Sequence, residues 1–317
     1  MLASIGDEVA RRLVTAILVE SVVYPKPGLV DRVHSLPEID LINLQSSAIS
    51  FYRWLRLAAI SGAKKAWRGR LGEYMLKMVE EMLRVQDGGN THLGVVMLVS
   101  PLSSAAGLLG SSEKWRSPEK LRRAVVHIVE KTDWRDCRNI LMAISRVSPG
   151  GLGEVPFLDV KKPETYRLIR EKRASIIDVF RPYMGRDMII DEYLDGYRMT
   201  FDVCLRALKQ WLRRTNNLEV SSVNALLEVM SRRPDTHISR RLGVEKARIV
   251  MTLAGRALRV GGAATREGLR AIDRMDEYLR RNDLRPGASA DILDAALCVL
   301  FLGAGRYSRE TLLDLLG

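Results

Sequence analysis

Apolar residues recur at three- and four-residue spacing along almost the whole chain, whereas alternating runs long enough for β-strands are nearly absent. This spacing places apolar side chains along one face of a helix. Polar loops that contain glycine or proline separate the periodic segments. The expected helices cover about 7–24, 43–62, 71–86, 92–110, 118–131, 134–147, 164–182, 188–214, 219–232, 243–260, 265–282, 289–303 and 308–316. The pattern therefore predicts an all-α fold.

The connections between these helices are short, and we find no internal repeat. We therefore expect residues 1–317 to form a single multi-helix bundle-like domain. The segment 93–112 has no charged side chain and is nearly long enough to span a membrane. It also contains Pro101, several serines and three glycines, which are sparse in lipid-facing helices. We expect a buried helix that is broken near Pro101, and no membrane contact.

The charge and the cysteine content narrow the classes of protein. Fifty Lys and Arg residues against 38 Asp and Glu residues give a net charge of +12, which should attract polyanions. Charge alone does not choose among nucleic acid, anionic membrane and a phosphorylated small molecule. The three cysteines show neither a disulfide pattern nor a zinc-binding spacing, and the N-terminus lacks a signal-peptide pattern. We expect a cytoplasmic protein, and the oligomeric state, including a homo-oligomer, stays open.

The first chemical candidate is a carboxylate on the apolar face of the first helix. Leu13 and Ile17 lie on one helical stripe, and Glu20 follows on or beside it. A carboxylate in that position must be paired, bind a cation or shift its pKa, because an isolated buried charge is costly. The helix then runs into Pro25–Gly28, a rigid turn whose glycine permits a positive φ.

This turn delivers Lys26, Asp31 and Arg32 close to Glu20. Cationic and acidic side chains on a stiff loop suit a site for phosphate and a metal ion. A helix end with solvated charges is the alternative interpretation of the same residues.

A second candidate follows Gly88-Gly89. Asn90 or Thr91 would cap the apolar helix that comes next, and the free amides at its start could receive an anion. His92 would lie in the first turn of this helix, as a proton donor, a metal ligand or a hydrogen-bonded core residue.

Two further helix starts carry acidic residues. Asp235 follows a proline and precedes two arginines, and Ser289 and Asp291 begin a strongly apolar helix. Ordinary helix capping would explain each of them alone. Together with the two motifs above, they predict a site built from helix ends and Gly/Pro loops at one end of the bundle.

The order of these motifs resembles the triphosphoribosyl-dephospho-CoA synthase family over residues 8–304. The combination of a PKPGLVD run with a downstream NTH-x-G is specific. The residues that carry the resemblance are Glu20, Pro25–Arg32, Asn90–His92, Gly94, Asp235-Thr236, Pro286-Gly287 and Ser289–Asp291. The resemblance implies an all-helical enzyme that moves the triphosphoribosyl group of ATP to the ribose 2′-hydroxyl of 3′-dephospho-CoA and releases adenine.

The resemblance also implies the roles of individual residues. Mg²⁺ is the expected metal ion and ATP is a substrate. The expected metal ligands are Glu20, Asp31, Asp87, Asp235 and Asp291; the expected catalytic residues are His92, Glu20 and Asp31; the expected substrate-binding residues are Lys26, Pro27, Gly28, Arg32, Asn90, Thr91, Gly94, Arg240 and Ser289.

The chain departs from the family pattern where an acceptor would bind. Leu93 stands where a lysine usually follows the histidine, and His34-Ser35 begins a run that differs from the usual Asn-Asn-Gly-Ala-His. A related ATP-binding transferase with a different acceptor is therefore the first alternative. A basic nucleic-acid-binding helical protein is the second, but its Arg-Arg pairs are scattered over many helices instead of one face.

Overall fold

The computed structural model describes residues 2–147, 159–160 and 162–304, and these residues contain helices but no β-strand. The predicted all-α fold is therefore confirmed. The elements are α1 (Leu2–Val22), α2 (Leu41–Ser50), α3 (Tyr52–Ala63), α4 (Leu71–Val85), α5 (Leu93–Leu109), α6 (Ser112–Trp115), α7 (Pro118–Glu130), α8 (Trp134–Val147), α9 (Pro163–Glu171), α10 (Ile176–Phe180), η1 (Arg181–Tyr183), α11 (Met188–Asp195), the π-helical segment η2 (Met199–Leu205), α12 (Arg206–Thr215), α13 (Leu218–Arg232), α14 (Thr236–Leu242), α15 (Val244–Arg259), η3 (Gly262–Ala264), α16 (Arg266–Arg281) and α17 (Gly287–Gly303).

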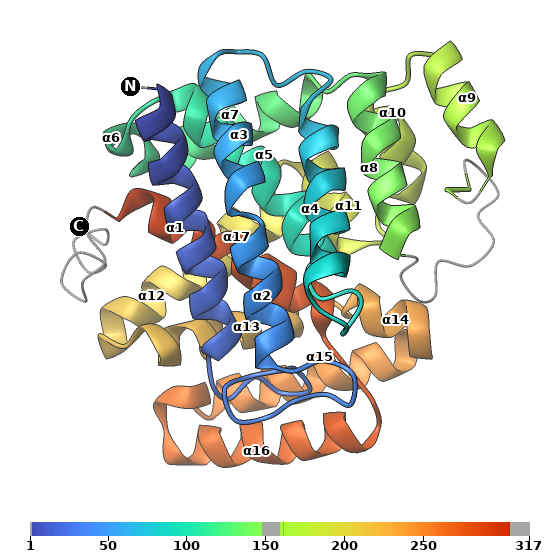
Figure 1. Ribbon diagram of the computed structural model, residues 1–317. Helices are drawn as coiled ribbons and strands as arrows, with labels where there is room; N and C mark the ends of the chain where they lie inside the picture. Colours follow the sequence, from blue (N-terminus) through green and yellow to red (C-terminus); the bar gives the residue numbers. More distant parts are fainter. Residues whose placement is uncertain (1, 148–158, 161, 305–317) are drawn as a thin grey trace.

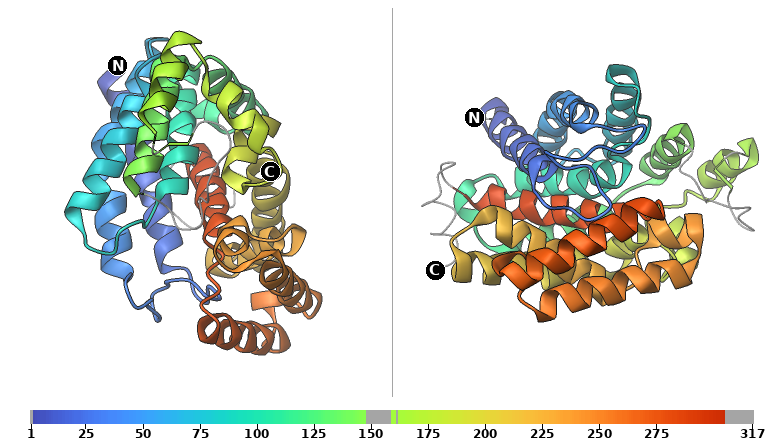
Figure 2. Two further views of the ribbon diagram at one scale, coloured as in Figure 1. Left: turned by 90° about the vertical axis from the view of Figure 1, so that its right-hand side faces the viewer. Right: turned by 90° about the horizontal axis from the view of Figure 1, so that it is seen from below.

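Helix α17 runs through the middle of the molecule (Figure 1). Helices α1 to α5 lie on one side of it and α12 to α16 on the other, as the two further views show (Figure 2). It contacts α1, α5, η2 and α13, and its side chains from Ile292 to Gly303 are buried. A helix that is apolar on all sides gains most when every face is covered, which explains its central position.

Pro101 does not break the helix that contains it, so the expected break is wrong. Helix α5 continues from Leu93 to Leu109 with Pro101 inside. A proline leaves the carbonyl four residues before it without its helical partner, and that carbonyl belongs to Met97. The hydroxyl of Tyr193 donates a hydrogen bond of 2.6 Å to this oxygen, so the group is satisfied although it is buried.

Three of the expected helices are divided in the structure. The segment 43–62 separates into α2 and α3 at Phe51, and 164–182 separates into α9 and α10 after Arg173, which has a positive φ of 50°. The segment 188–214 ends its first helix at Gly196 and then passes through η2. The expected helix at 308–316 lies outside the described residues.

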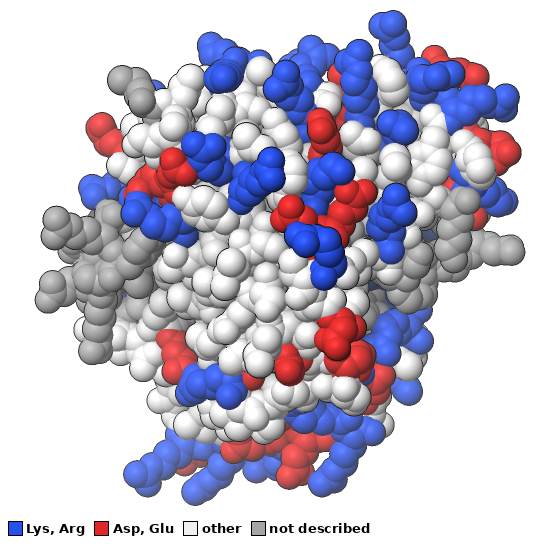
Figure 3. Space-filling view, in the orientation of Figure 1, with Lys and Arg blue, Asp and Glu red and all other residues white. Residues whose placement is uncertain are grey.

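Charged side chains on the face shown in Figure 3 occur in two groups, one toward the upper rim and one at the lower end, with an uncharged band between them. Acidic residues are interspersed with basic ones in both groups. No described helix is both long enough and apolar enough to cross a membrane. Cys137, Cys204 and Cys298 are buried free thiols.

Candidate active site

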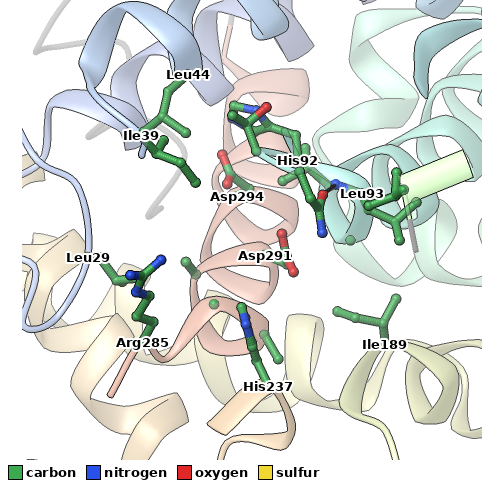
Figure 4. Close-up of a pocket in the computed structure, with 18 of the residues that line it drawn as sticks. Leu29, Ile39, Leu44, His92, Leu93, Ile189, His237, Arg285, Asp291 and Asp294 are labelled. Atoms are coloured by element: carbon green, nitrogen blue, oxygen red, sulfur yellow. Dashed lines mark hydrogen bonds between the residues drawn. The ribbon is translucent and has the colours of Figure 1, made fainter. Parts of the chain in front are cut away.

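A pocket of about 430 Å³ lies where the end of α1 and the loop after it meet the first residues of α5, α11 and α17 and one side of α14. Figure 4 shows Asp291 and Asp294 on α17 facing this space, with His92 near Asp294 and His237 below Asp291. The predicted meeting of helix ends is confirmed.

Glu20 and Lys26 form a buried ion pair at the wall of the pocket. Lys26 Nζ donates to Glu20 Oε1 at 2.7 Å and to the Glu20 carbonyl oxygen at 3.0 Å. Their side chains are 4% and 2% exposed. Removal of one partner of such a pair leaves an uncompensated buried charge, which typically costs about 3–5 kcal/mol. Both residues line the pocket, as the sequence predicted.

Asp31 is also buried, but it does not line the pocket. Its carboxylate accepts hydrogen bonds from the backbone N–H groups of Lys26, Val33 and His34 at 3.2, 2.9 and 2.7 Å. These bonds fix the loop that carries Lys26. Asp31 therefore holds the loop in place, and its expected catalytic and metal-binding roles stay predictions.

The remaining predicted residues of this loop do not line the pocket. Gly28 has a φ of 72°, and a Cβ on it would lie 2.4 Å from the Leu284 carbonyl oxygen, so only glycine fits. Arg32 pairs with Glu219 on the surface and covers the ring of Tyr24. Pro27 is likewise absent from the lining. The structure thus does not place Pro27, Gly28 or Arg32 for direct substrate contact.

The second motif lines the pocket from the start of α5. The N-cap residue of α5 is His92, not Asn90 or Thr91 as expected, but Asn90 Oδ1 accepts a hydrogen bond from the Leu93 N–H at 3.1 Å. Thr91 Oγ1 lies 2.8 Å from Ser47 Oγ, and this contact ties the motif to α2. Asp87, at the other end of the preceding loop, is exposed, bonds to Asn43 and does not line the pocket.

His92 is 3% exposed, and its Nδ1 atom is buried without a hydrogen-bond partner. Burial, assisted by the nearby charge of Lys26, lowers the pKa of His92 to about 3. The imidazole is therefore neutral at physiological pH, and it can form a hydrogen bond to a ligand but does not carry a spare proton. Its ring and that of Phe51 lie nearly perpendicular, with ring centroids 5.8 Å apart.

Helix α17 supplies two carboxylates, of which the sequence interpretation identified only one. Asp291 and Asp294 are three residues apart and both line the pocket. Burial, and then the charges of neighbouring carboxylates, raise the pKa of Asp291 well above its usual value. The pKa of Asp294 is also raised well above its usual value, by burial first and then by Glu20. Asp294 Oδ1 has no hydrogen-bond partner, so this oxygen is available to a ligand.

Gly94 is the reason that α5 can lie so close to Asp291. A Cβ at position 94 would be 2.1 Å from Asp291 Oδ2. Gly94 lines the pocket, as the sequence predicted. The signal that could have identified Asp294 is its position, one helical turn after Asp291 on a helix with no other charged residue.

Asp235 and Ser289 connect two helix starts instead of lining the pocket. One oxygen of Asp235 accepts from the N–H groups of His237 and Ile238 and caps α14. The other oxygen accepts from both the N–H and the hydroxyl of Ser289, at 2.8 and 2.7 Å. Both residues therefore make the hydrogen bonds of helix capping, and neither lines the pocket, although the charge of Asp235 is close enough to raise the pKa of Asp291.

A cationic group forms one side of the pocket. Arg240, a predicted substrate-binding residue, lies here and pairs with Asp187. The sequence interpretation missed its companions Arg241, Arg285 and His237, which come from α14 and from the loop before α17. The sequence predicted that these two helix starts meet, but it did not show that these particular side chains line the pocket.

The donor set can accommodate Mg²⁺ only together with a ligand. Within the described part of the chain, no group of three or more His, Cys, Asp or Glu side chains is arranged to hold a metal ion. Mg²⁺, however, commonly uses one or two carboxylates and completes its shell with water and substrate phosphates. Asp291 and Asp294, with the unpartnered oxygen of Asp294, meet that smaller requirement. The structure does not bring the five predicted ligands to one place.

Buried carboxylates on one side and arginines on the other define an all-helical protein with a pocket for a phosphorylated small molecule. The whole-chain comparison is more specific. Residues 6–310 match the family described as ATP:dephospho-CoA triphosphoribosyl transferase, and the chain belongs to this family of triphosphoribosyl transferases.

Related proteins cover nearly the full length of the chain. A Klebsiella pneumoniae protein named 2-(5''-triphosphoribosyl)-3'-dephosphocoenzyme-A synthase is 27% identical over 91% of this chain and 88% of its own length. A Pseudomonas savastanoi pv. phaseolicola protein, named a probable enzyme of the same kind, is 26% identical over 97% and 96% of the two chains. A crystal structure from Archaeoglobus fulgidus, described as a candidate triphosphoribosyl-dephospho-CoA synthase, shares the fold with a TM-score of 0.58 and 21% identity, over 80% of this chain and 97% of that one.

Proposed function

We propose that this protein transfers the triphosphoribosyl group of ATP to the ribose 2′-hydroxyl of 3′-dephospho-CoA and releases adenine. Family membership over almost the entire chain supports this activity. The observation that carries the proposal is the position of Asp291, Asp294 and His92 in one pocket with the Glu20–Lys26 pair. In the transfer, the bond from the ribose C1′ to adenine breaks and a bond from C1′ to the acceptor oxygen forms. The proton lost by the hydroxyl balances the proton gained by adenine.

The carboxylates of Asp294 and Glu20 would stabilise the positive charge that develops on the ribose as adenine departs. Asp294 has an unpartnered oxygen that can also receive the hydroxyl proton. His92, which burial keeps neutral, would hydrogen-bond to the departing base and orient it. The lowered pKa of His92 favours this orienting role over the proton donation considered from the sequence.

Mg²⁺ would be held by Asp291 together with phosphate oxygens of the nucleotide. When bound, it would neutralise phosphate charge. Lys26 keeps Glu20 fixed at 2.7 Å instead of reaching for phosphate. The three cysteines are buried free thiols, which is typical of proteins in a reducing compartment. We therefore propose a cytoplasmic location.

The test is to mix the purified protein with ATP, Mg²⁺ and 3′-dephospho-CoA and to measure adenine by liquid chromatography. We expect adenine release that requires both substrates, with a product whose mass equals dephospho-CoA plus the triphosphoribosyl group. Reactions without acceptor and without protein are the controls. Absence of adenine in the complete mixture would overturn the proposal.

A second set of reactions tests the identity of the acceptor. Leu93 lines the pocket with an apolar side chain where a lysine is usual in the family. A panel of other hydroxyl-bearing nucleotides, offered with ATP under the same conditions, should give less adenine than dephospho-CoA does. A higher rate with another acceptor would assign a related transferase activity instead.

A further inference from the structure

The side of the pocket opposite Asp294 is a cluster of cationic side chains that neither sequence motif contains. Its members are His237, Arg240 and Arg241 of α14 and Arg285 of the loop before α17. Figure 4 shows Arg285 and His237 on the side of the pocket where α17 begins, with Asp291 between them and Asp294. We call these four residues the arginine cluster.

The pKa of His237 reflects the positive charge of the cluster. Burial lowers the pKa of His237 to about 4, and the charges of nearby guanidinium groups add to this shift. The contributing residues are Arg240, Arg241 and Arg285. A Cβ on Gly287 would lie 2.5 Å from His237 Nδ1, so the ring packs directly against the start of α17. Three arginines therefore surround a neutral imidazole at a helix N-terminus, where an anion is favoured.

The carboxylates that now pair with two of these arginines are easy to replace. The Arg285 side chain is only 13% exposed, whereas those of its partners Glu38 and Asp283 are 53% and 50% exposed. Asp283 also pairs with Arg241. Ion pairs to such exposed carboxylates contribute little, typically about 0–1 kcal/mol. An incoming phosphate can take their place without leaving a buried charge unpaired.

Arg240 is held differently. Its partner Asp187 is itself fixed, because it accepts hydrogen bonds from the N–H groups of Ile189 and Ile190 at the start of α11. The Nε atom of Arg240 is buried without a hydrogen-bond partner. This guanidinium is therefore held in place and still has a donor available for a ligand.

We propose that the arginine cluster is the subsite for the triphosphate of the nucleotide donor, with Arg240 and Arg285 as its main contacts. The assignment rests on the proposed transferase function. It gives the donor a direction: phosphates at the start of α17, and the ribose C1′ farther along this helix beside Asp294 and His92. A chain of three phosphoryl groups matches three guanidinium groups better than the diphosphate of the acceptor does.

Binding of inorganic tripolyphosphate, measured by titration calorimetry without any acceptor, tests the subsite directly. We expect Arg285→Gln and Arg240→Gln each to weaken its binding at least about tenfold, because each removes charge-assisted hydrogen bonds. Arg281→Gln is the matched control, since Arg281 is 76% exposed on α16 and pairs with Glu277. Unchanged affinity in both Arg285→Gln and Arg240→Gln would overturn the assignment.

A variant that is expected to bind tripolyphosphate more tightly excludes a general folding defect as the cause of the weaker binding. Glu38→Gln removes a carboxylate that competes for Arg285, so tripolyphosphate should bind about two- to fivefold more tightly than to the wild type. Damage to the fold does not produce tighter binding. Weaker binding by Glu38→Gln would contradict the replacement of Glu38 by phosphate.

Steady-state kinetics separates the two possible sources of phosphate. The KM for ATP should rise in Arg285→Gln while the KM for dephospho-CoA stays the same; the reverse result would assign the cluster to the acceptor and overturn the proposal. If tripolyphosphate binds as expected but no adenine forms in the wild type, the transferase function fails and the subsite stands. If adenine forms but the variants bind tripolyphosphate normally, the function stands and the subsite fails.

Discussion

The loop between α1 and α2 and the helix α17 both bring carboxylates to the region of the pocket, but they use them in different ways. In the loop, Asp31 gives its oxygens to three backbone N–H groups. In α17, Asp294 keeps one oxygen without a partner in the pocket. The loop with the more distinctive sequence motif therefore has mainly a structural role. Helix α17, whose sequence is less distinctive, supplies the carboxylate that is free to contact a ligand. Substitutions can test this contrast.

The largest effect is expected from Asp294→Asn. Loss of a carboxylate that stabilises the reacting ribose and receives a proton should lower kcat for adenine release by about 10²-fold or more. Asn has nearly the same shape, so the fold should persist. The exposed Asp273 on α16 provides the control Asp273→Asn, which should leave kcat unchanged. An unaltered kcat in Asp294→Asn would show that the carboxylate of α17 is no more important for the reaction than that of the loop.

Asp31→Asn should act on stability instead. The NH2 group of Asn would replace one carboxylate oxygen, so at least one backbone N–H would lose its acceptor and face a donor, and the free energy of unfolding should fall by about 1–3 kcal/mol. Urea unfolding followed by circular dichroism measures this change. A variant that is as stable as the wild type but inactive would indicate that Asp31 takes part in the reaction.

Asp291→Asn should raise stability while it removes activity. The pKa of Asp291 is raised well above 3.8 in the folded state, so the folded protein retains a proton that the unfolded chain releases. Wild-type stability therefore falls as the pH rises above about 3.8, until the folded pKa is reached. Asn does not ionise, so this loss of stability is absent in Asp291→Asn. A gain of about 1 kcal/mol in the free energy of unfolding would raise Tm by roughly 2–4 °C.

Thermal unfolding of Asp291→Asn and the wild type in buffer with a chelator checks this sign. The difference in Tm should be larger near about pH 8 than near about pH 4. An equal difference at both values would mean that the stability change does not come from the ionisation of Asp291.

The smallest effect is expected from Arg32→Gln. Arg32 pairs with Glu219 at the surface, and the side chains are 44% and 37% exposed. Loss of an exposed pair typically changes stability by less than about 1 kcal/mol, and the KM for ATP should not change. A clear rise in this KM would place the loop motif in direct contact with the nucleotide.

Sequence periodicity predicted the helices well because their apolar faces are continuous. The motifs at the helix ends identified Glu20, Lys26 and His92, which line the pocket. The sequence pattern missed the continuity of α5, because the bond from Tyr193 to the Met97 carbonyl joins residues that are 96 positions apart. It missed Arg285 for the same reason, since the contacts of this residue with Glu38 depend on tertiary structure.

The sequence did not show how the carboxylates of Asp31 and Asp235 are bonded in the fold, and their expected roles at the site stay predictions. A sequence shows that an acid is near a turn, but it does not show which way the backbone N–H groups point. Both residues are surrounded by such groups in the structure. Their carboxylates are therefore satisfied before any ligand arrives.

The contact between Arg285 and Glu38 joins positions separated by 247 residues. During synthesis, the segment with Glu20 and Lys26 leaves the ribosome long before α17 exists, so the growing chain has no complete place for a nucleotide. Ligand affinity is consequently a property of the finished tertiary structure, and a bound nucleotide should slow proteolysis at sites far from the pocket as well as near it.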